Sequence, residues 1–166
     1  MSTTYAVAPS RSGNPLARFT TALFGLFPMS LTLAVLRVTL ALPFFKAGET
    51  DWDGWFTLSF GVKARFNDFM LHIFGAEYPF PQPELMAWGA GIAEVALPTL
   101  LVIGLATRYA AAGLLVMTAV IQLTCPDGWM NFHLPWASMA LAILTFGPGK
   151  IALDWVLGLD RVSRPG

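Results

Sequence analysis

Charged residues are scarce in this sequence. Lys, Arg, Asp and Glu together make up 12% of its 166 residues, about half of the roughly 25% that is usual in a soluble domain. Lys and Arg number 10, as do Asp and Glu, and no basic run occurs, so the sequence indicates no nucleic-acid partner. Hydrophobic residues make up 55%, with 13 Phe and 6 Trp, which is more than a core of this size can bury. Most of the surface is therefore expected to face a lipid bilayer.

Cysteine and histidine are also rare. The single cysteine, Cys125, excludes an internal disulfide and a metal cluster held by cysteine alone. The two histidines, His72 and His133, stand in a loop and at a helix start, so they provide no helical pair for haem. No P-loop, dinucleotide fingerprint, CxxC pair or Ser-His-Asp arrangement occurs. The sequence therefore encodes no cofactor by a motif and indicates no catalytic residue.

What the sequence does contain is four apolar segments that are candidates to span a bilayer. The third and fourth, with about 16 residues each, need their flanks or a locally thinner bilayer to cross. A soluble helical bundle is disfavoured because these segments lack polar faces wide enough to meet water. The first segment contains Arg37 and has no small-residue cleavage site after it, so it is interpreted as a retained helix and not a signal peptide. The predicted fold is all-α, an integral membrane four-helix bundle with short interfacial helices. Its spans are expected at 29–46, 84–105, 109–124 and 131–146.

Two further stretches place apolar residues on one helical face. Each is predicted to form a short helix lying in the membrane interface. The first, 16–27, aligns Leu16, Phe19, Leu23, Leu26 and Phe27, and the second, 62–73, aligns Val62, Phe66, Phe69, Met70 and Ile73.

The resulting organisation has one domain between two tails. An N-terminal tail, 1–28, contains the first interfacial helix, and the transmembrane domain covers 29–147. A C-terminal tail, 148–166, follows a Gly-Pro-Gly turn and is expected to form a short surface helix within 150–160.

The distribution of Lys and Arg predicts the orientation. With four spans, both termini and the turn after the second span lie on one side, which contains Arg11, Arg18, Arg108, Lys150, Arg161 and Arg164. The opposite loops contain only Lys46, Lys63 and Arg65, together with most of the acidic residues. Both termini are therefore expected in the cytoplasm.

One carboxylate, Glu94, falls in the middle of the second apolar segment. Small residues surround it at helical spacing, so Glu94 is expected to point into the bundle; these are Ala87, Ala90, Gly91 and Pro98. Arg37 should lie at a similar depth in the first span. Because unpaired charges are costly in a membrane, the two are predicted to form a buried ion pair, with Gln122 or Thr39 satisfying leftover hydrogen-bonding groups.

This pair has two interpretations that the sequence leaves open. It can be a structural strut that fixes how the helices align, or it can be a site for a proton, an ion or the polar head of a ligand. An arginine would hold the carboxylate ionised, which favours the anchoring of a polar head over the transfer of protons.

The loop 125–133 gathers soft metal ligands. Cys125, Met130 and His133 could hold Cu(I), with Met130 and His133 on one helix face. The simpler interpretation is an ordinary Pro-Asp-Gly turn followed by interfacial tryptophans, Trp129 and Trp136.

Several ordered motifs resemble the DoxX family of small bacterial membrane proteins. They are the intramembrane glutamate followed by Gly104-Leu105-x-Thr107-Arg108, and Gly147-Pro148-Gly149 followed by Leu153-Asp154. Many relatives have Ser before this Leu-Asp, where this chain has Ala152, and the Asp-Trp-Asp-Gly-Trp stretch extends the first loop. The resemblance implies a four-helix bundle in the bacterial inner membrane. It implies no agreed catalytic residues.

The family resemblance also directs the functional hypotheses. Family members are linked to quinone-coupled redox systems and to oxidative-stress or metal-stress proteins, so we expect an accessory or anchoring subunit that binds a soluble or membrane redox partner. A quinone between the helices would meet Arg37 or Glu94. The alternatives are a homo-oligomeric transporter for a small solute, proton or metal ion, and a structural scaffold without catalysis.

Overall fold

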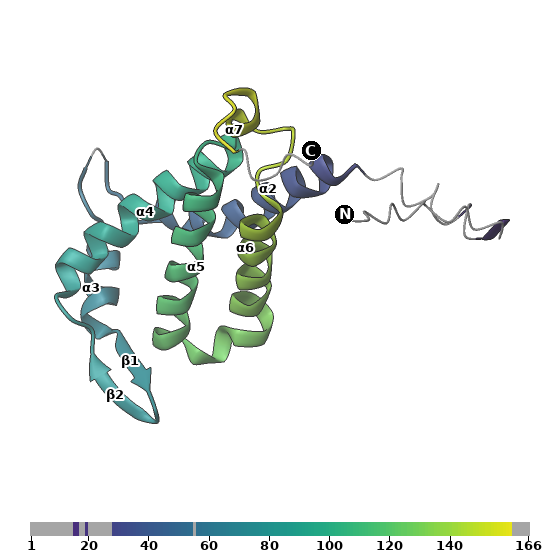
Figure 1. Ribbon diagram of the computed structural model, residues 1–166. Helices are drawn as coiled ribbons and strands as arrows, with labels where there is room; N and C mark the ends of the chain where they lie inside the picture. Colours follow the sequence, from purple (N-terminus) through teal and green to yellow (C-terminus); the bar gives the residue numbers. More distant parts are fainter. Residues whose placement is uncertain (1–14, 17–18, 20–27, 55, 161–166) are drawn as a thin grey trace, which may run out of the picture.

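The fold is dominated by four helices in a bundle (Figure 1). The computed structural model describes residues 15–16, 19, 28–54 and 56–160. Within them the long helices are α2 (Met29–Thr50), α4 (Pro83–Ile103), α5 (Thr107–Thr124) and α6 (Leu134–Phe146). The expected helix over 16–27 lies almost entirely outside the described residues, as do the start of the N-terminal tail and the last residues of the C-terminal tail.

The helix lengths agree with membrane crossing. Among the described residues, α2, α4 and α5 have 22, 21 and 18 residues and are long and apolar enough to span a bilayer. The helix α6 has 13 residues, about 20 Å at 1.5 Å per residue. A π-helical turn, η2 (Trp129–His133), runs directly into it and lengthens it at one end.

The bundle has two opposite ends, which are named here by an element of each. The α7 end contains the start of α2, the turn between α4 and α5, the end of α6, and the short helix α7 (Leu153–Val156). The hairpin end contains α3 (Phe60–Asp68), strands β1 (Met70–Ile73) and β2 (Ala76–Pro79), and the turn η1 (Pro126–Gly128). In Figure 1 the α7 end is at the top and the hairpin at the bottom left.

The bundle core is built from close helix contacts. The pairs α2–α4, α5–α6, α4–α5 and α2–α6 pack against each other. Alanines at the contacts let the backbones approach, as is usual where helices associate in lipid. The core consists of Leu40, Ala41, Phe44, Leu101, Ala110, Ala111, Leu114, Ala140 and Ile143.

The buried face of α4 follows the small-residue stripe of the sequence. Ala87, Gly91, Glu94, Pro98 and Leu101 are its buried residues. They repeat at three- and four-residue intervals, so they form one stripe along the helix. Glu94 therefore points into the bundle, in agreement with the expectation.

The predicted surface helix over 62–73 is wrong in its second half. The helix α3 ends at Asp68, Phe69 is extended, and Met70 pairs with Pro79 in an antiparallel hairpin. The turn places Phe74 and Gly75 at positive φ, a conformation typical of a two-residue hairpin turn. Contacts among the rings of Phe66, Phe69 and Phe80 hold the hairpin against α3. Phe80 lies outside 62–73, so helical periodicity within that stretch could not predict its contacts with Phe66 and Phe69.

Candidate functional site

A cavity of about 480 Å³ lies between α3, α4 and α5, at the hairpin end. One wall is aromatic and consists of Phe66, Phe69 and Phe80, and the others are mostly aliphatic residues of α4 and α5. Its polar side chains include Arg65 and Glu94, and the thiol of Cys125 also lines it. An apolar cavity with a few converging polar groups has the usual form of a small-molecule site.

Two of the lining side chains, Arg65 and Glu94, form a polar cluster with Asp51, which is buried and does not itself line the cavity. Arg65 Nη2 donates to Asp51 Oδ1 at 2.8 Å, and the Glu94 carboxyl group is a neighbour of the Asp51 carboxyl group. Asp51 is 1% exposed and Glu94 is 9% exposed. Asp51 Oδ2 and Glu94 Oε2 are buried without a hydrogen-bond partner that the described residues could donate.

Local structure explains how three distant positions converge. Asp51 follows the last residue of α2, and its carbonyl accepts from Ser59 N at 2.8 Å. The Ser59 side chain caps α3 by accepting from Val62 N, as an N-cap serine does. The chain therefore turns back directly after Asp51 and starts α3 beside it, so that Arg65 faces the Asp51 carboxylate.

Gly48 allows α2 to approach Glu94. A Cβ atom at Gly48 would lie 3.1 Å from the Cβ atom of Glu94 and 3.0 Å from a methyl group of Val95. Because Asp51 is three residues after Gly48 on the same helical face, this close approach brings the two carboxyl groups together.

The predicted ion pair between Arg37 and Glu94 does not form in this structure. Arg37 Nη1 donates to the carbonyl of Leu101 at 3.4 Å, and Arg37 Nη2 donates to the carbonyl of Ile151. Along α2, Arg37 precedes Gly48 by about three turns, or roughly 16 Å. Side chains also tilt toward the N-terminus of their own helix. In the antiparallel pair α2–α4 the two side chains therefore point toward opposite ends.

The residues of the two family motifs meet at the α7 end. Both oxygens of Asp154 accept from the start of α5, one from Ala106 N and the other from Thr107 N, each at 2.8 Å. Gly104, at φ +77°, leaves room for the Arg37 guanidinium and Ala152. This cluster fixes the C-terminal segment across the helix ends.

Arg108 joins the same structure. It donates to the carbonyl of Leu144 and, through Nε, to Asp160 Oδ2 at 3.3 Å. Both of these contacts are within the protein.

Gln122 also has partners other than the expected ones. Its Nε2 donates to the carbonyl of Pro126 at 3.2 Å, and its Oε1 lies 2.6 Å from His133 Nδ1. Gln122 thus stabilises the turn between α5 and α6, and these hydrogen bonds go to Pro126 and His133 instead of Arg37 or Glu94.

The candidate copper ligands Cys125, Met130 and His133 stand in different environments. Cys125 is exposed and Met130 is 70% exposed, whereas His133 is 3% exposed. The His133 ring is enclosed by Gly128 and Trp136. In residues 28–54 and 56–160 no group of three His, Cys, Asp or Glu side chains is placed to hold a metal ion. Copper binding by the Cys-Met-His set stays a prediction.

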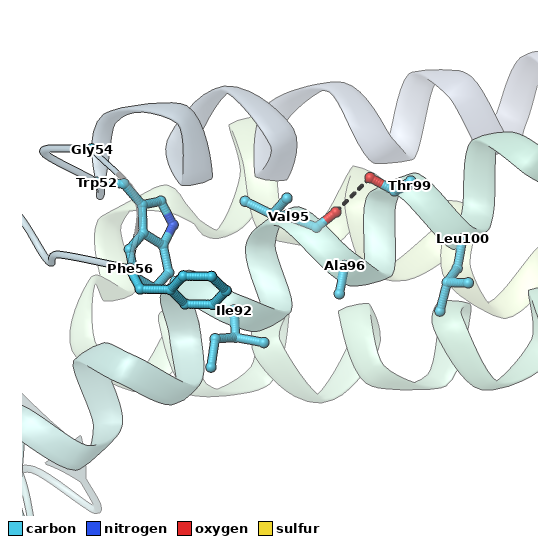
Figure 2. A pocket seen from close by; sticks show the side chains of 9 residues that line it. Trp52, Gly54, Phe56, Ile92, Val95, Ala96, Thr99 and Leu100 are labelled. Atoms are coloured by element: carbon cyan, nitrogen blue, oxygen red, sulfur yellow. Dashed lines mark hydrogen bonds between the residues drawn. The ribbon is translucent and has the colours of Figure 1, made fainter.

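A second, shallower groove of about 740 Å³ follows the other face of α4. Figure 2 shows Trp52 and Phe56 at one end of it and Ile92, Val95 and Leu100 along α4. The Thr99 hydroxyl donates to the carbonyl of Val95 and so is satisfied within its own helix. This groove is almost wholly apolar, which suits contact with lipid chains.

Sequence reasoning missed Asp51 and Arg65 as partners of Glu94. Both were counted only among the loop charges that determine orientation. A signal was available, because Asp51 lies one helical turn beyond Gly48, at the end of an apolar helix whose small residue permits close approach.

The helices with their apolar outer surfaces, and the charged groups enclosed between them, define an all-α integral membrane protein. The chain belongs to the DoxX family, whose model matches residues 32–127. It is 28% identical over 142 residues to an uncharacterized protein of Haemophilus influenzae, an alignment covering 76% of this chain and 83% of that protein. No solved structure matches the chain.

Proposed function

We propose that this protein is an accessory or anchoring subunit of a membrane redox system and that it binds a quinone in the cavity between α3, α4 and α5. The observation on which this proposal rests is the cavity itself, which combines aromatic walls with one cluster of polar side chains. The chain offers no redox centre among the sequence motifs, so electrons would come from a partner protein or a bound cofactor.

The cavity residues fit a quinone head. Phe66, Phe69 and Phe80 provide apolar ring faces, and flat rings pack well against such faces. Arg65, with 46% of its side chain exposed, has further N–H groups that can donate to a quinone carbonyl. The quinone would supply the electron-accepting group, and this chain would hold and orient its head.

A matched pair of substitutions on α4 tests this proposal. Ala93→Phe would fill the cavity, whereas Ala96→Phe introduces the same side chain into the groove of Figure 2. We expect quinone to co-purify with the wild type and Ala96→Phe in mild detergent and to be lost from Ala93→Phe. Lipid extraction and native mass spectrometry measure it. Wild-type protein without quinone, or equal retention by both variants, would contradict the proposal.

We further propose that the protein lies in the bacterial inner membrane with both termini in the cytoplasm. The natural single cysteine tests this, because Cys125 is exposed and lies at the hairpin end. A membrane-impermeant thiol reagent should label Cys125 in intact spheroplasts. Labelling that requires permeabilised membranes would reverse the orientation.

Transport of protons or small cations is a second candidate function, favoured by the carboxyl groups of Asp51 and Glu94 beside the cavity. Four spans are few for a monomeric transporter, so this function would involve a homo-oligomer. Proteoliposomes that show flux in the absence of any redox partner would support it over the accessory role.

A further inference from the structure

We infer that Asp51 and Glu94 share a single proton and form, together with Arg65, an electrically neutral proton-binding site on the wall of the cavity. This inference does not depend on the quinone of the proposed function. It concerns what the three side chains hold in the resting protein.

The carboxyl groups of Asp51 and Glu94 are brought together at this site. The close approach of α2 to Glu94 at Gly48 makes the Asp51 and Glu94 carboxyl groups neighbours, and oxygens Asp51 Oδ2 and Glu94 Oε2 are left without a donor among the described residues. Two ionised carboxylates offer only acceptors, so they repel each other at this separation. A proton between them turns the repulsion into a hydrogen bond.

The unpartnered oxygens of the two carboxyl groups are shielded from solvent. Both of these oxygens are buried, and the two residues are 1% and 9% exposed. These two oxygens are therefore shielded from solvent, although Glu94 as a whole lines the cavity. A proton satisfies both oxygens without moving the helices.

The charges around the pair also favour one shared proton. Arg65 is the cation that faces the pair, through its 2.8 Å contact with Asp51 Oδ1. Two carboxyl groups with one shared proton carry one negative charge, which the guanidinium balances. From α5 and the residue after it, the titratable group lining the cavity is the Cys125 thiol. A neutral arrangement avoids the cost of a net charge among membrane helices.

Other buried acids at the α7 end do not share this arrangement. Both oxygens of Asp154 accept backbone N–H groups, so neither lacks a donor. Asp160 faces Arg108. Of the buried acids that the structure describes, Asp51 and Glu94 are therefore the pair that needs a proton.

Infrared spectroscopy of the full-length protein in lipid nanodiscs tests the inference, because a protonated carboxyl group has a carbonyl band that an ionised one lacks. The wild type should show one such band at neutral pH. Glu94→Gln and Asp51→Asn should each remove it completely, because the carboxylate that remains is then balanced by Arg65 alone. Glu84→Gln changes an exposed acid in the first turn of α4, and should leave the band unchanged.

Each other outcome overturns the inference. A wild-type spectrum without the band means that no proton is held. A band that survives either Glu94→Gln or Asp51→Asn in the folded protein means that the proton is not shared. If a variant does not fold, wild-type protein with carbon-13 in its aspartate or its glutamate side chains replaces it. Either label should then shift the band, and a shift with only one label contradicts sharing.

Discussion

The two ends of this bundle treat buried acidic residues differently. At the α7 end, Asp154 is 5% exposed and both of its oxygens accept backbone N–H groups. At the hairpin end, Asp51 and Glu94 are similarly buried, yet one oxygen of each faces no donor among the described side chains and backbone groups. The first arrangement is complete within the protein, whereas the second borders a cavity.

This difference separates a structural cluster from a candidate binding site. The α7 end joins the start of α2, the α4–α5 turn and the C-terminal segment through hydrogen bonds that occupy both oxygens of Asp154. Arg37 Nε and Thr107 Oγ1 are also buried there without partners, but these residues do not line the cavity. Buried polar groups left without partners are costly, so the two beside the cavity call for a proton, a water or a ligand group as partner. Burial and charge alone would not have distinguished the two ends.

The largest expected effect is at the α7 end. Asp154→Ala should lower the free energy of unfolding by about 3 kcal/mol, because two backbone donors lose a charged acceptor at the start of α5. Unfolding in detergent micelles, followed by circular dichroism, measures the change. Glu84→Ala is the control for removing an exposed acid. A loss for Asp154→Ala no larger than that of the control would contradict the proposed role of the α7 end.

Gly104→Ala tests the same end through packing. A Cβ atom at Gly104 would meet Arg37 Nη1 and lie 2.7 Å from the Cβ atom of Ala152, at φ +77°. The loss of stability should be about 2 kcal/mol. Gly89→Ala, within α4 and with nothing within 4 Å of the added Cβ atom, should instead gain roughly 0.5 kcal/mol from helix propensity. Equal shifts of the melting temperature for both variants would show that the close approach at Gly104 does not affect stability.

Replacing a carboxyl group by an amide at each end compares how much stability each buried acid provides. Asp154→Asn presents an amide donor to one of two backbone donors and should cost about 1–2 kcal/mol. Glu94→Gln keeps the shape of a protonated glutamate and should change stability by less than about 0.5 kcal/mol. Thermal melts of the two variants side by side measure this. A larger loss for Glu94→Gln than for Asp154→Asn would reverse the assignment of the two ends.

The smallest expected effect is a coupling close to zero between Arg37 and Glu94. Residues without shared partners have additive effects within about 0.5 kcal/mol, and these two residues bind different groups at different levels of the bundle. A double-mutant cycle with Arg37→Ala and Glu94→Ala measures the coupling. A coupling above about 1 kcal/mol would restore the ion pair predicted from the sequence.

Much of the fold was predictable because a helix that crosses lipid needs a long run of apolar residues. Runs of apolar residues at 29–46, 84–105 and 109–124 correspond to α2, α4 and α5 within a few residues. The hairpin after Asp68 was not predicted, since its four-residue strands are stabilised by contacts with Phe66 and Phe80 and not by a local pattern.

Hydropathy and the spacing of small residues are local properties, so the sequence alone establishes a helical membrane protein and a Glu94 that faces the bundle interior. The pairing of the charged side chains follows from the tertiary structure instead. The partners of Arg37 and Glu94 depend on where α2 crosses α4 and on how Ser59 turns α3 back toward Asp51. These are relations between distant segments, and spacing along one helix does not contain them.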